Sequence, residues 1–257
     1  MSSPSTTRLT TPPTTIDDFL GGAVRLEQPR DGYRVAMDTV LLASAIPAKA
    51  GDTILEPGIG TAGAALCLTS RIKGVTVHGF DASTEMLDFA HKNIARNGFK
   101  DRITVAEGCV THLDGDGSSY DHVMMNPPFL KPGSGRAPKG ETKTTAHMNA
   151  TADLSDWLRL AVHHTKARGS ITIVHRADQL DKIITGLSGP CGDICIFPLW
   201  PGESQPAKRV IIQALKGSKG PSRLLAGLCL HGPGERYTEA ASRVLMDGAA
   251  LDLASSF

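Results

Sequence analysis

A glycine-rich segment directly after a short β-rich run constrains the fold of this chain more than any other feature. The run Thr53–Glu56 leads into Glu-Pro-Gly-Ile-Gly-Thr-Ala-Gly over residues 56–63, and a helical pattern extends from Thr61 to Arg71. Glycines in such a turn let the backbone approach a ligand closely, and the N-terminus of the following helix points at that ligand. We therefore expect a strand, a ligand-binding loop and a helix as the first unit of an α/β fold.

Apolar runs alternate with helical patterns along the rest of the chain, which predicts a doubly wound α/β fold with a mostly parallel sheet. The expected strands are Thr53–Glu56, Val75–Phe80, Ile103–Ala106, Tyr120–Met125, Ser170–His175, Asp193–Leu199 and Arg209–Leu215. The expected helices are Thr61–Arg71, Ser83–Asn97, Leu154–Ala167 and Ala177–Leu187. No convincing helix separates the last two strands, so we expect an antiparallel pair at one edge. A short strand at Leu224–Leu230 and a helix at Thr238–Met246 should follow.

The composition favours one folded domain. Of the 257 residues, 40% are hydrophobic and 21% charged, which provides enough apolar material for a packed core. Residues 1–15 are mostly Ser, Thr and Pro, with Arg8 as the only charge, so we expect a disordered tail there. One domain should then occupy residues 16–257, with an N-terminal lead-in and a C-terminal extension.

Charge and cysteine usage exclude several classes of protein. The net charge of +1 excludes a uniformly basic nucleic-acid coat protein. Five cysteines, an odd number with no Cys-x-x-Cys pair, argue against a disulfide framework and a zinc ribbon, so we expect reduced thiols, no metal and a cytoplasmic location. Apolar stretches such as Val40–Ile46 fall far short of the ~20 residues that a membrane helix needs, so no membrane partner is expected.

An acidic residue follows the glycine loop at the spacing of a nucleoside site. Asp81 closes the next expected strand, where a carboxylate can accept both hydroxyls of a ribose. Both S-adenosylmethionine (SAM) and NAD carry such a ribose, but Glu56 favours SAM, because a carboxylate repels a pyrophosphate and attracts the cationic groups of a sulfonium amino acid. The structural alternative is that Glu56 caps the loop and Asp81 caps the helix near Ser83. The residues expected at the cofactor are Glu56, Gly58, Ile59, Gly60, Asp81, Ala82 and Asn126.

The fourth expected strand ends in Asn126-Pro127-Pro128-Phe129, which we interpret as the catalytic loop. The Asn126 side-chain oxygen and the Pro127 carbonyl can accept hydrogen bonds from one planar amino group, and Phe129 can stack on a flat ring or amide. An aromatic amine is a poor nucleophile because its lone pair is delocalised. Holding both of its hydrogens favours a pyramidal nitrogen and points the lone pair at the methyl group, so catalysis rests on orientation. The alternative is a rigid strand-ending loop with Phe129 in the core.

Two segments carry a local surplus of basic residues. Residues 205–223 contain five basic residues and no acidic one, and a second cluster after the catalytic loop faces only Glu141. RNA phosphates would use such patches. The candidates for RNA binding are Lys131, Arg136, Lys139, Lys143, Lys208 and Arg209. The alternative is that these residues lie in solvated loops and on an edge strand protected by lysines.

The ordered set of glycine loop, acid and Asn-Pro-Pro-Phe resembles that of the class I SAM-dependent methyltransferases that methylate amines. These include adenine-N6, guanine-N2 and protein-glutamine enzymes. Further segments resemble the bacterial family that methylates adenine N6 in a valine tRNA beside the anticodon. They are residues 18–22, 28–34, 38–42, 175–178, 198–201 and 205–210, within a resemblance that spans about Asp17 to Asp252.

The resemblance implies a seven-stranded sheet whose last strand is antiparallel, and an element with Tyr33 and Asp38 that covers the methionine end of SAM. Asp38 as a plain helix N-cap is the alternative. An acidic residue after the third strand usually contacts the adenine amine in such enzymes. This chain has Glu107-Gly108-Cys109 there. Cys109 can still supply a backbone contact, whereas the side-chain acceptor is lost unless Glu107 substitutes.

The sequence therefore predicts methyl transfer from SAM to an exocyclic amine of RNA, with adenine N6 in tRNA as the first hypothesis. The same chemistry on a protein glutamine, a DNA adenine or an rRNA guanine remains an alternative. A NAD-dependent oxidoreductase is supported only by the literal Gly-x-Gly-x-x-Gly match. The remaining hypothesis is an RNA-binding module without catalytic activity.

Overall fold

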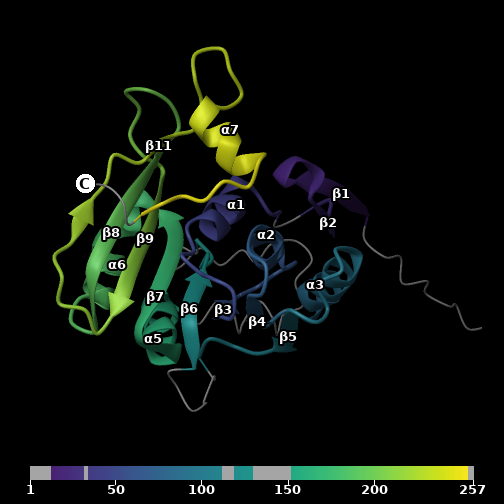
Figure 1. The fold of residues 1–257 in the computed structure, drawn as a ribbon, viewed down its shortest axis with the longest axis horizontal. Coiled ribbons are helices and arrows are strands. Elements are labelled where there is room, and N and C mark those ends of the chain that lie inside the picture. The colour runs from purple at the N-terminus through teal and green to yellow at the C-terminus, as the bar shows by residue number, and fades with distance from the viewer. Residues whose placement is uncertain (1–12, 32–33, 112–118, 130–151, 254–257) are drawn as a thin grey trace, which may run out of the picture.

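A computed structural model describes residues 13–31, 34–111, 119–129 and 152–253 (Figure 1). The strands of its main sheet are β3 (Thr53–Pro57), β4 (Thr76–Asp81), β5 (Ile103–Glu107), β6 (Tyr120–Met125), β7 (Thr165–Arg176), β8 (Cys191–Trp200), β9 (Arg209–Lys216), β10 (Arg223–Leu224) and β11 (Leu228–Cys229). Within the described residues this sheet has nine strands. Eight of them follow the order β10-β8-β9-β7-β6-β3-β4-β5, and the ninth, β11, pairs with β8.

The strand directions confirm a doubly wound, mostly parallel sheet. β5, β4, β3, β6 and β7 are parallel neighbours, and β9 runs antiparallel to both β7 and β8. The expected antiparallel pair is therefore present, with β9 inserted between β7 and β8. The two-residue strands β10 and β11 extend the sheet beyond the seven strands that the resemblance implied.

Helices cover both faces of this sheet, which explains why its strands read as nearly continuous apolar runs. The helices are α1 (Met37–Ser44), α2 (Gly63–Arg71), α3 (Thr84–Arg96), α5 (Leu154–His164), α6 (Leu180–Leu187) and α7 (Glu239–Leu245). Side chains from α1, α2, α3 and α7 form the core on one face, and those from α5 and α6 form the core on the other.

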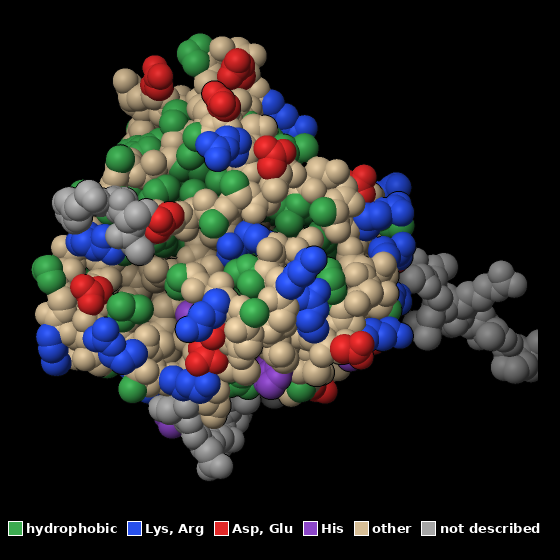
Figure 2. Space-filling view, in the orientation of Figure 1, with side chains coloured by type: hydrophobic (Ala, Val, Ile, Leu, Met, Phe, Trp, Pro, Cys, Tyr) green, Lys and Arg blue, Asp and Glu red, His purple; other side chains and the backbone are tan. Residues whose placement is uncertain are grey.

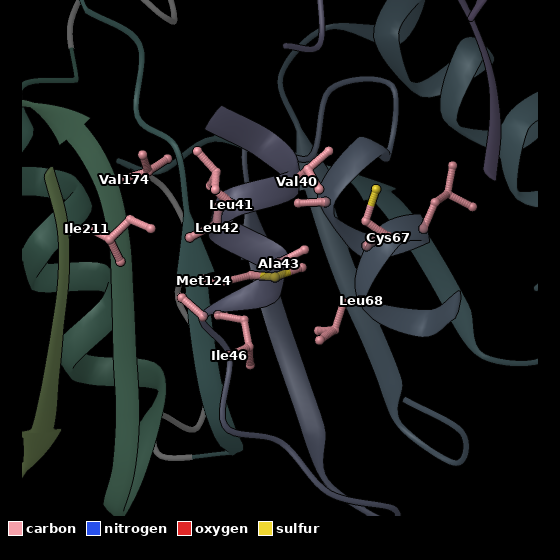
Figure 3. Close-up of a cluster of buried hydrophobic side chains, with 14 of the residues drawn as sticks. Val40, Leu41, Leu42, Ala43, Ile46, Cys67, Leu68, Met124, Val174 and Ile211 are labelled. Atoms are coloured by element: carbon pink, nitrogen blue, oxygen red, sulfur yellow. The ribbon is translucent and has the colours of Figure 1, made fainter. Parts of the chain in front are cut away.

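Helix α1 is buried on all sides. Residues 39–46 are buried without interruption. Figure 3 shows α1 between Met124 and Ile211 of the sheet and Cys67 and Leu68 of α2. A helix surrounded by other elements in this way is fixed rigidly. The residues at its first turn are therefore held at a set place relative to the sheet.

The N-terminal lead-in forms a hairpin that the sequence analysis did not predict. Its strands are β1 (Thr14–Phe19) and β2 (Val24–Pro29), which pair antiparallel, so β1 begins one residue before the expected end of the tail at residue 15. Strand β1 is too polar to show an alternating pattern. It is held instead by Asp17, which accepts hydrogen bonds from Arg34 and Gln28, both at 2.8 Å.

Helix α5 is shorter than expected, and strand β7 begins earlier. The helix was expected to run to Ala167, but it ends at His164 and the chain enters β7 at Thr165. Arg168 has a φ of +67°, and a Cβ atom on Gly169 would lie 2.6 Å from the Asp121 carbonyl oxygen. The ladder between β6 and β7 shifts register at this point, so the apparent end of the helix pattern is a bulged strand.

The C-terminal extension adds two short pairings and a capped helix. The single strand expected at Leu224–Leu230 is divided at Gly227, whose φ is +82° and whose Cβ would lie 2.2 Å from the Pro198 carbonyl oxygen. Helix α7 lies within the expected range, and Thr238 caps it by accepting from the Ala241 N–H at 3.1 Å. Among the described residues, no helix is both long and apolar enough to span a membrane.

Candidate active site

Three neighbouring strands bring the glycine loop, the acid and the Asn-Pro-Pro-Phe loop to one edge of the sheet. β3 pairs in parallel with β6 on one side and with β4 on the other. The loop after β3 is therefore flanked by Asn126 at the end of β6 and by Asp81 at the end of β4. Ligands bind at this carboxyl edge in open α/β sheets.

The glycine loop is held by backbone hydrogen bonds to strand β4. Gly58 and Gly60 have φ values of +65° and +55°, which favour glycine. The Ile59 N–H donates to the Phe80 carbonyl at 3.0 Å, and the Gly60 N–H donates to Asp81 Oδ2 at 2.9 Å. The loop and the acidic residue thus form one unit.

Asp81 also has a structural role, although helix α3 is capped by Ser83 and not by Asp81 as the alternative had it. Its Oδ1 atom accepts from the Ser83 N–H at 2.9 Å, directly before helix α3. Burial raises the pKa of the Asp81 carboxyl, and backbone hydrogen bonds from Ser83, Gly60 and Ala82 oppose this rise. The two roles are compatible because a carboxylate has about four acceptor positions.

Glu56 supplies a buried carboxyl group with unused acceptor capacity. Its residue exposure is 6%, and Oε2 has no hydrogen-bond partner among the described residues. Burial is the main reason that the pKa of Glu56 is raised well above its usual range, and the negative charge of Asp81 adds to this, whereas a hydrogen bond from the Ala65 N–H opposes it. A buried acceptor of this kind fits a cationic group such as the ammonium of an amino acid.

The remaining expected cofactor contacts lie around this unit. Ile59 is buried beneath the loop, where a Cβ atom on Gly79 would lie 2.2 Å from Ile59 Cδ1. Ala82 is half-buried next to Asp81, and Cys109 is half-buried after β5. Glu107, the possible substitute for the missing acid, is exposed and lies in register with Asp81.

The Asn-Pro-Pro-Phe loop leaves the sheet directly after Met125, the last residue of β6. Pro127 is buried, Pro128 is exposed, and Asn126 and Phe129 are half-buried. Phe129 is not part of the core, since its ring contacts two polar side chains. The Arg209 guanidinium lies 4.6 Å from its centroid, and the His175 ring meets it edge to face at 5.0 Å.

Asp38 lies in the first turn of α1 but does not cap it. The N-cap residue is Ala36, without a side-chain hydrogen bond. Asp38 Oδ2 instead accepts from Arg209 Nε at 2.9 Å, and the two side chains are 18% and 32% exposed. The simple capping role is therefore not what the structure shows. Tyr33, the other residue implied at the methionine end, lies outside the described residues.

His175 and Trp200 have mainly structural surroundings. Burial is the main cause that lowers the pKa of His175 to about 4, so the ring is neutral near pH 7. Trp200 Nε1 donates to the Ala226 carbonyl at 2.9 Å.

Of the basic candidates, Lys208 is exposed and Arg209 is half-buried. The remaining basic candidates, namely Lys131, Arg136, Lys139 and Lys143, lie outside the described residues.

The sequence analysis missed two neighbours of the site. Trp157 on α5 packs against Gly58, and Arg209 points at Phe129 instead of outward. The capping box at the start of α5, formed by Asp153 and Asp156, gave a signal for the helix but none for the contact of Trp157 with the loop.

A separate cavity of about 320 Å³ lies over the open end of the sheet, on the face that α5 and α6 cover elsewhere. Its lining residues include His78, Phe80, Thr104, Ala106 and Tyr120. No residue of the loop over residues 56–63 lines it. Glu107 also lines this cavity, which is otherwise separate from the glycine loop and from the Asn-Pro-Pro-Phe loop.

Comparison with known proteins agrees with this architecture. A family model described as "Methyltransferase domain" matches residues 54–132, from β3 to just beyond the Asn-Pro-Pro-Phe loop. The solved structure of a predicted O-methyltransferase from Agrobacterium tumefaciens superposes with a TM-score of 0.69 at 24% identity, over 83% of this chain and 98% of that chain. A phosphoethanolamine N-methyltransferase 2 from Haemonchus contortus, solved in complex with SAM, superposes with a TM-score of 0.51 at 15% identity, over 70% and 52% of the two chains.

The family model assigns residues 54–132 to a methyltransferase domain, and the sheet has the class I fold of SAM-dependent methyltransferases. Within that class the chain is similar to tRNA1(Val) (adenine(37)-N6)-methyltransferases. It is 29% identical to one from Porphyromonas gingivalis over 62% of this chain and 64% of the relative. It is 25% identical to one from Erwinia tasmaniensis over 85% and 89%.

A second group of relatives acts on protein. The chain is 32% identical to a release factor glutamine methyltransferase from Agrobacterium fabrum over 107 residues, or 40% of this chain. It thus spans only 36% of that relative and 64% of the Porphyromonas relative.

Proposed function

We propose that this protein transfers a methyl group from SAM to an exocyclic amine of RNA, with adenine N6 in tRNA as the acceptor. The observation that carries this proposal is the adjacency of β3 and β6, which places the loop with Glu56 beside the loop with Asn126. The cofactor half and the acceptor half of the site therefore share one sheet edge. SAM supplies an electrophilic methyl group, and the chain supplies binding and orientation.

On the cofactor side, Asp81 and the glycine loop hold the nucleoside, and Glu56 takes the cationic amino-acid end. Asp81 is already aligned by the Gly60 and Ser83 N–H groups, so its carboxylate needs no rearrangement on binding. Glu56 gains a cationic partner for a buried carboxyl group that otherwise has spare acceptor capacity.

On the acceptor side, the Asn126 side-chain oxygen and the Pro127 carbonyl hold the two hydrogens of the acceptor amine, and Phe129 stacks on its planar group. No strong general base is needed because the amine is held in the geometry for transfer. For an adenine in structured RNA the base must leave its stack, and Phe129 replaces part of the lost stacking.

The choice of RNA rests on Lys208, on the basic segments and on the longer span of the tRNA methyltransferase similarity. Figure 2 shows that basic and acidic side chains are interspersed on the visible face, so RNA would contact local basic patches instead of one continuous surface. Glutamine in a protein is the second candidate, because a release factor glutamine methyltransferase is 32% identical to this chain over 107 residues.

The first test is calorimetric titration with S-adenosylhomocysteine (SAH) and with NAD. Binding of SAH alone supports the proposal, and binding of NAD alone contradicts it. Labelled SAM is then supplied with unmodified tRNA1(Val), with the same transcript carrying guanine at position 37, and with a release-factor peptide containing glutamine. We expect label only in the first RNA. Label in the peptide and not in the RNA would overturn the choice of acceptor.

The Asn126→Ala variant is the matched control for the chemistry. It should largely preserve SAH binding but lose transfer, because the amide oxygen that orients the amine is gone. Transfer at the wild-type rate in this variant would contradict the role given to the loop.

A further inference from the structure

Arg209 lies where it can touch both halves of the site. It is the first residue of β9 and pairs with Arg176, the last residue of β7. Because β9 runs antiparallel, its first residue stands at the edge where the parallel strands end. The chain therefore delivers Arg209 to the same edge as the glycine loop and the Asn-Pro-Pro-Phe loop.

The Arg209 side chain bridges two elements of the site. Its Nε donates to Asp38 Oδ2 at 2.9 Å, which ties it to the first turn of the buried helix α1. Its guanidinium carbon lies 4.6 Å from the centroid of the Phe129 ring. A planar guanidinium within ~6 Å of a ring centroid is held by cation–π attraction, and its flat shape matches the flat ring.

The Phe129 ring is held by a second contact. His175 meets it edge to face, with ring centroids 5.0 Å apart and an angle of 89° between the planes. His175 is 3% exposed and cannot swing away without leaving the core. The aromatic ring of the acceptor loop is thus fixed by one cationic and one neutral side chain.

We propose that Arg209 is a positioning residue for methyl transfer. It fixes the Phe129 ring, with Asp38 orienting the guanidinium, so that the planar group of the acceptor stacks on the ring face that Arg209 does not cover. This inference rests on the proposed function and deepens it. It gives Arg209 a role at the acceptor loop in place of the phosphate contact that the sequence suggested.

The proposal predicts that Arg209 acts through Phe129, which a double-mutant cycle measures. Arg209→Ala should lower kcat/KM for the acceptor on the order of tenfold to a hundredfold, since a displaced positioning group has effects of that size. In a Phe129→Leu background the same substitution should change kcat/KM by less than about twofold. SAH affinity should be unchanged in all three variants. Equal losses in both backgrounds would overturn the proposal, because a phosphate contact does not depend on the ring.

Two further variants separate positioning from charge. Arg209→Lys keeps the positive charge but lacks the planar guanidinium, so it should recover little activity. Full recovery would indicate a phosphate contact. Arg176→Ala removes a cation at the neighbouring position, one paired with Asp178, and should have little effect. A loss as large as that of Arg209→Ala would indicate a general electrostatic effect and contradict the proposal.

The kinetics are measured on whichever acceptor the wild type methylates, so a switch from tRNA to a glutamine peptide changes the proposed function and leaves this test intact. If neither is methylated, the proposed function fails, and NMR of the acceptor-free protein decides the inference. The Arg209 Nε–H resonance should show a ring-current shift that disappears in Phe129→Leu and a hydrogen-bond shift that disappears in Asp38→Asn. A resonance that neither substitution moves would overturn the proposal.

Discussion

Trp157 leaves no room for a side chain on Gly58. A Cβ atom at Gly58 would lie 2.6 Å from Cη2 of Trp157, and the φ of this glycine is +65°. Gly58 is therefore required for two independent reasons, its left-handed backbone and its contact with helix α5.

Gly58→Ala should lower both stability and cofactor affinity. The left-handed backbone alone costs about 1–2 kcal/mol for a residue with a Cβ atom, and displacement of the buried Trp157 ring adds to it. Gly98→Ala is the matched control, because its φ is +73° and nothing lies within 4 Å of its Cβ position. Denaturant unfolding and SAH titration should show a larger loss for Gly58→Ala, with affinity lost only there. Equal losses in both variants would contradict the contact with Trp157.

Glu56→Gln should stabilise the cofactor-free protein at neutral and alkaline pH. Burial raises the pKa of Glu56 well above its ordinary value of 4.5, so the folded state holds this proton more tightly than the unfolded state. The contribution of Glu56 is fully present below pH 4.5 and is lost as the pH rises through the raised pKa. The stability gap between variant and wild type, followed by chemical unfolding, should therefore widen from pH 4.5 to pH 8. A difference in stability that stays constant over this pH range would contradict the raised pKa of Glu56.

Cofactor binding should release protons from Glu56. SAH retains a cationic amino group, which favours the ionised carboxylate once it is bound. At any pH where unbound Glu56 keeps its proton, the calorimetric enthalpy of SAH binding should therefore depend on the ionisation enthalpy of the buffer, which titrations at several pH values measure. Glu56→Gln should reduce this dependence. An unchanged buffer dependence would place the released proton on another group.

His175 should contribute to acid sensitivity. Its pKa is lowered from 6.5 to about 4, so between these values the unfolded state binds more protons and stability falls as the pH drops. His175→Phe keeps a ring against Phe129 but removes this titration. Chemical unfolding at pH 7 and pH 4.5 should show that the variant loses less stability than the wild type. Parallel losses would contradict the depressed pKa.

Lys208→Ala should weaken RNA binding and make it less sensitive to salt. One lost phosphate contact reduces the slope of log K against log salt by about one. Lys73→Ala is the control, because Lys73 is exposed and precedes strand β4 at the opposite edge of the sheet. Filter binding across a salt series measures both slopes. A slope unchanged by Lys208→Ala would remove this residue from the RNA interface.

The sequence was a good guide to the sheet because its long strands are buried on both faces and bounded by clear turns. The run Tyr120–Met125 coincides with β6, and Thr53–Glu56 differs from β3 by one residue. It was a poor guide where tertiary contacts decide local structure. Strand β1 is too polar to show the apolar pattern of a strand. The helical pattern of α5 runs on into the first residues of β7, where the strand is bulged at Arg168 and Gly169.

In the candidate site, too, local sequence patterns predicted some features and missed those that depend on tertiary contacts. Glycines, an acid and prolines at strand ends carry their local chemistry in the sequence, so Gly58, Asp81 and Asn126 could be placed at one edge in advance. The contact of Asp38 with Arg209 joins residues 171 positions apart, and no local pattern predicts it. Only the antiparallel insertion of β9 brings this arginine to the edge.

The ion pair between Asp38 and Arg209 also bears on the order in which the parts of the site are completed during synthesis. A chain is made from its N-terminus, and the elements that carry Glu56, Asp81 and Cys109 emerge early. The arginine that we propose to fix Phe129 emerges only with β9, the last long strand of the sheet. On the proposed assignment, a growing chain thus contains every described residue of the methyl-donor site before the acceptor site is complete.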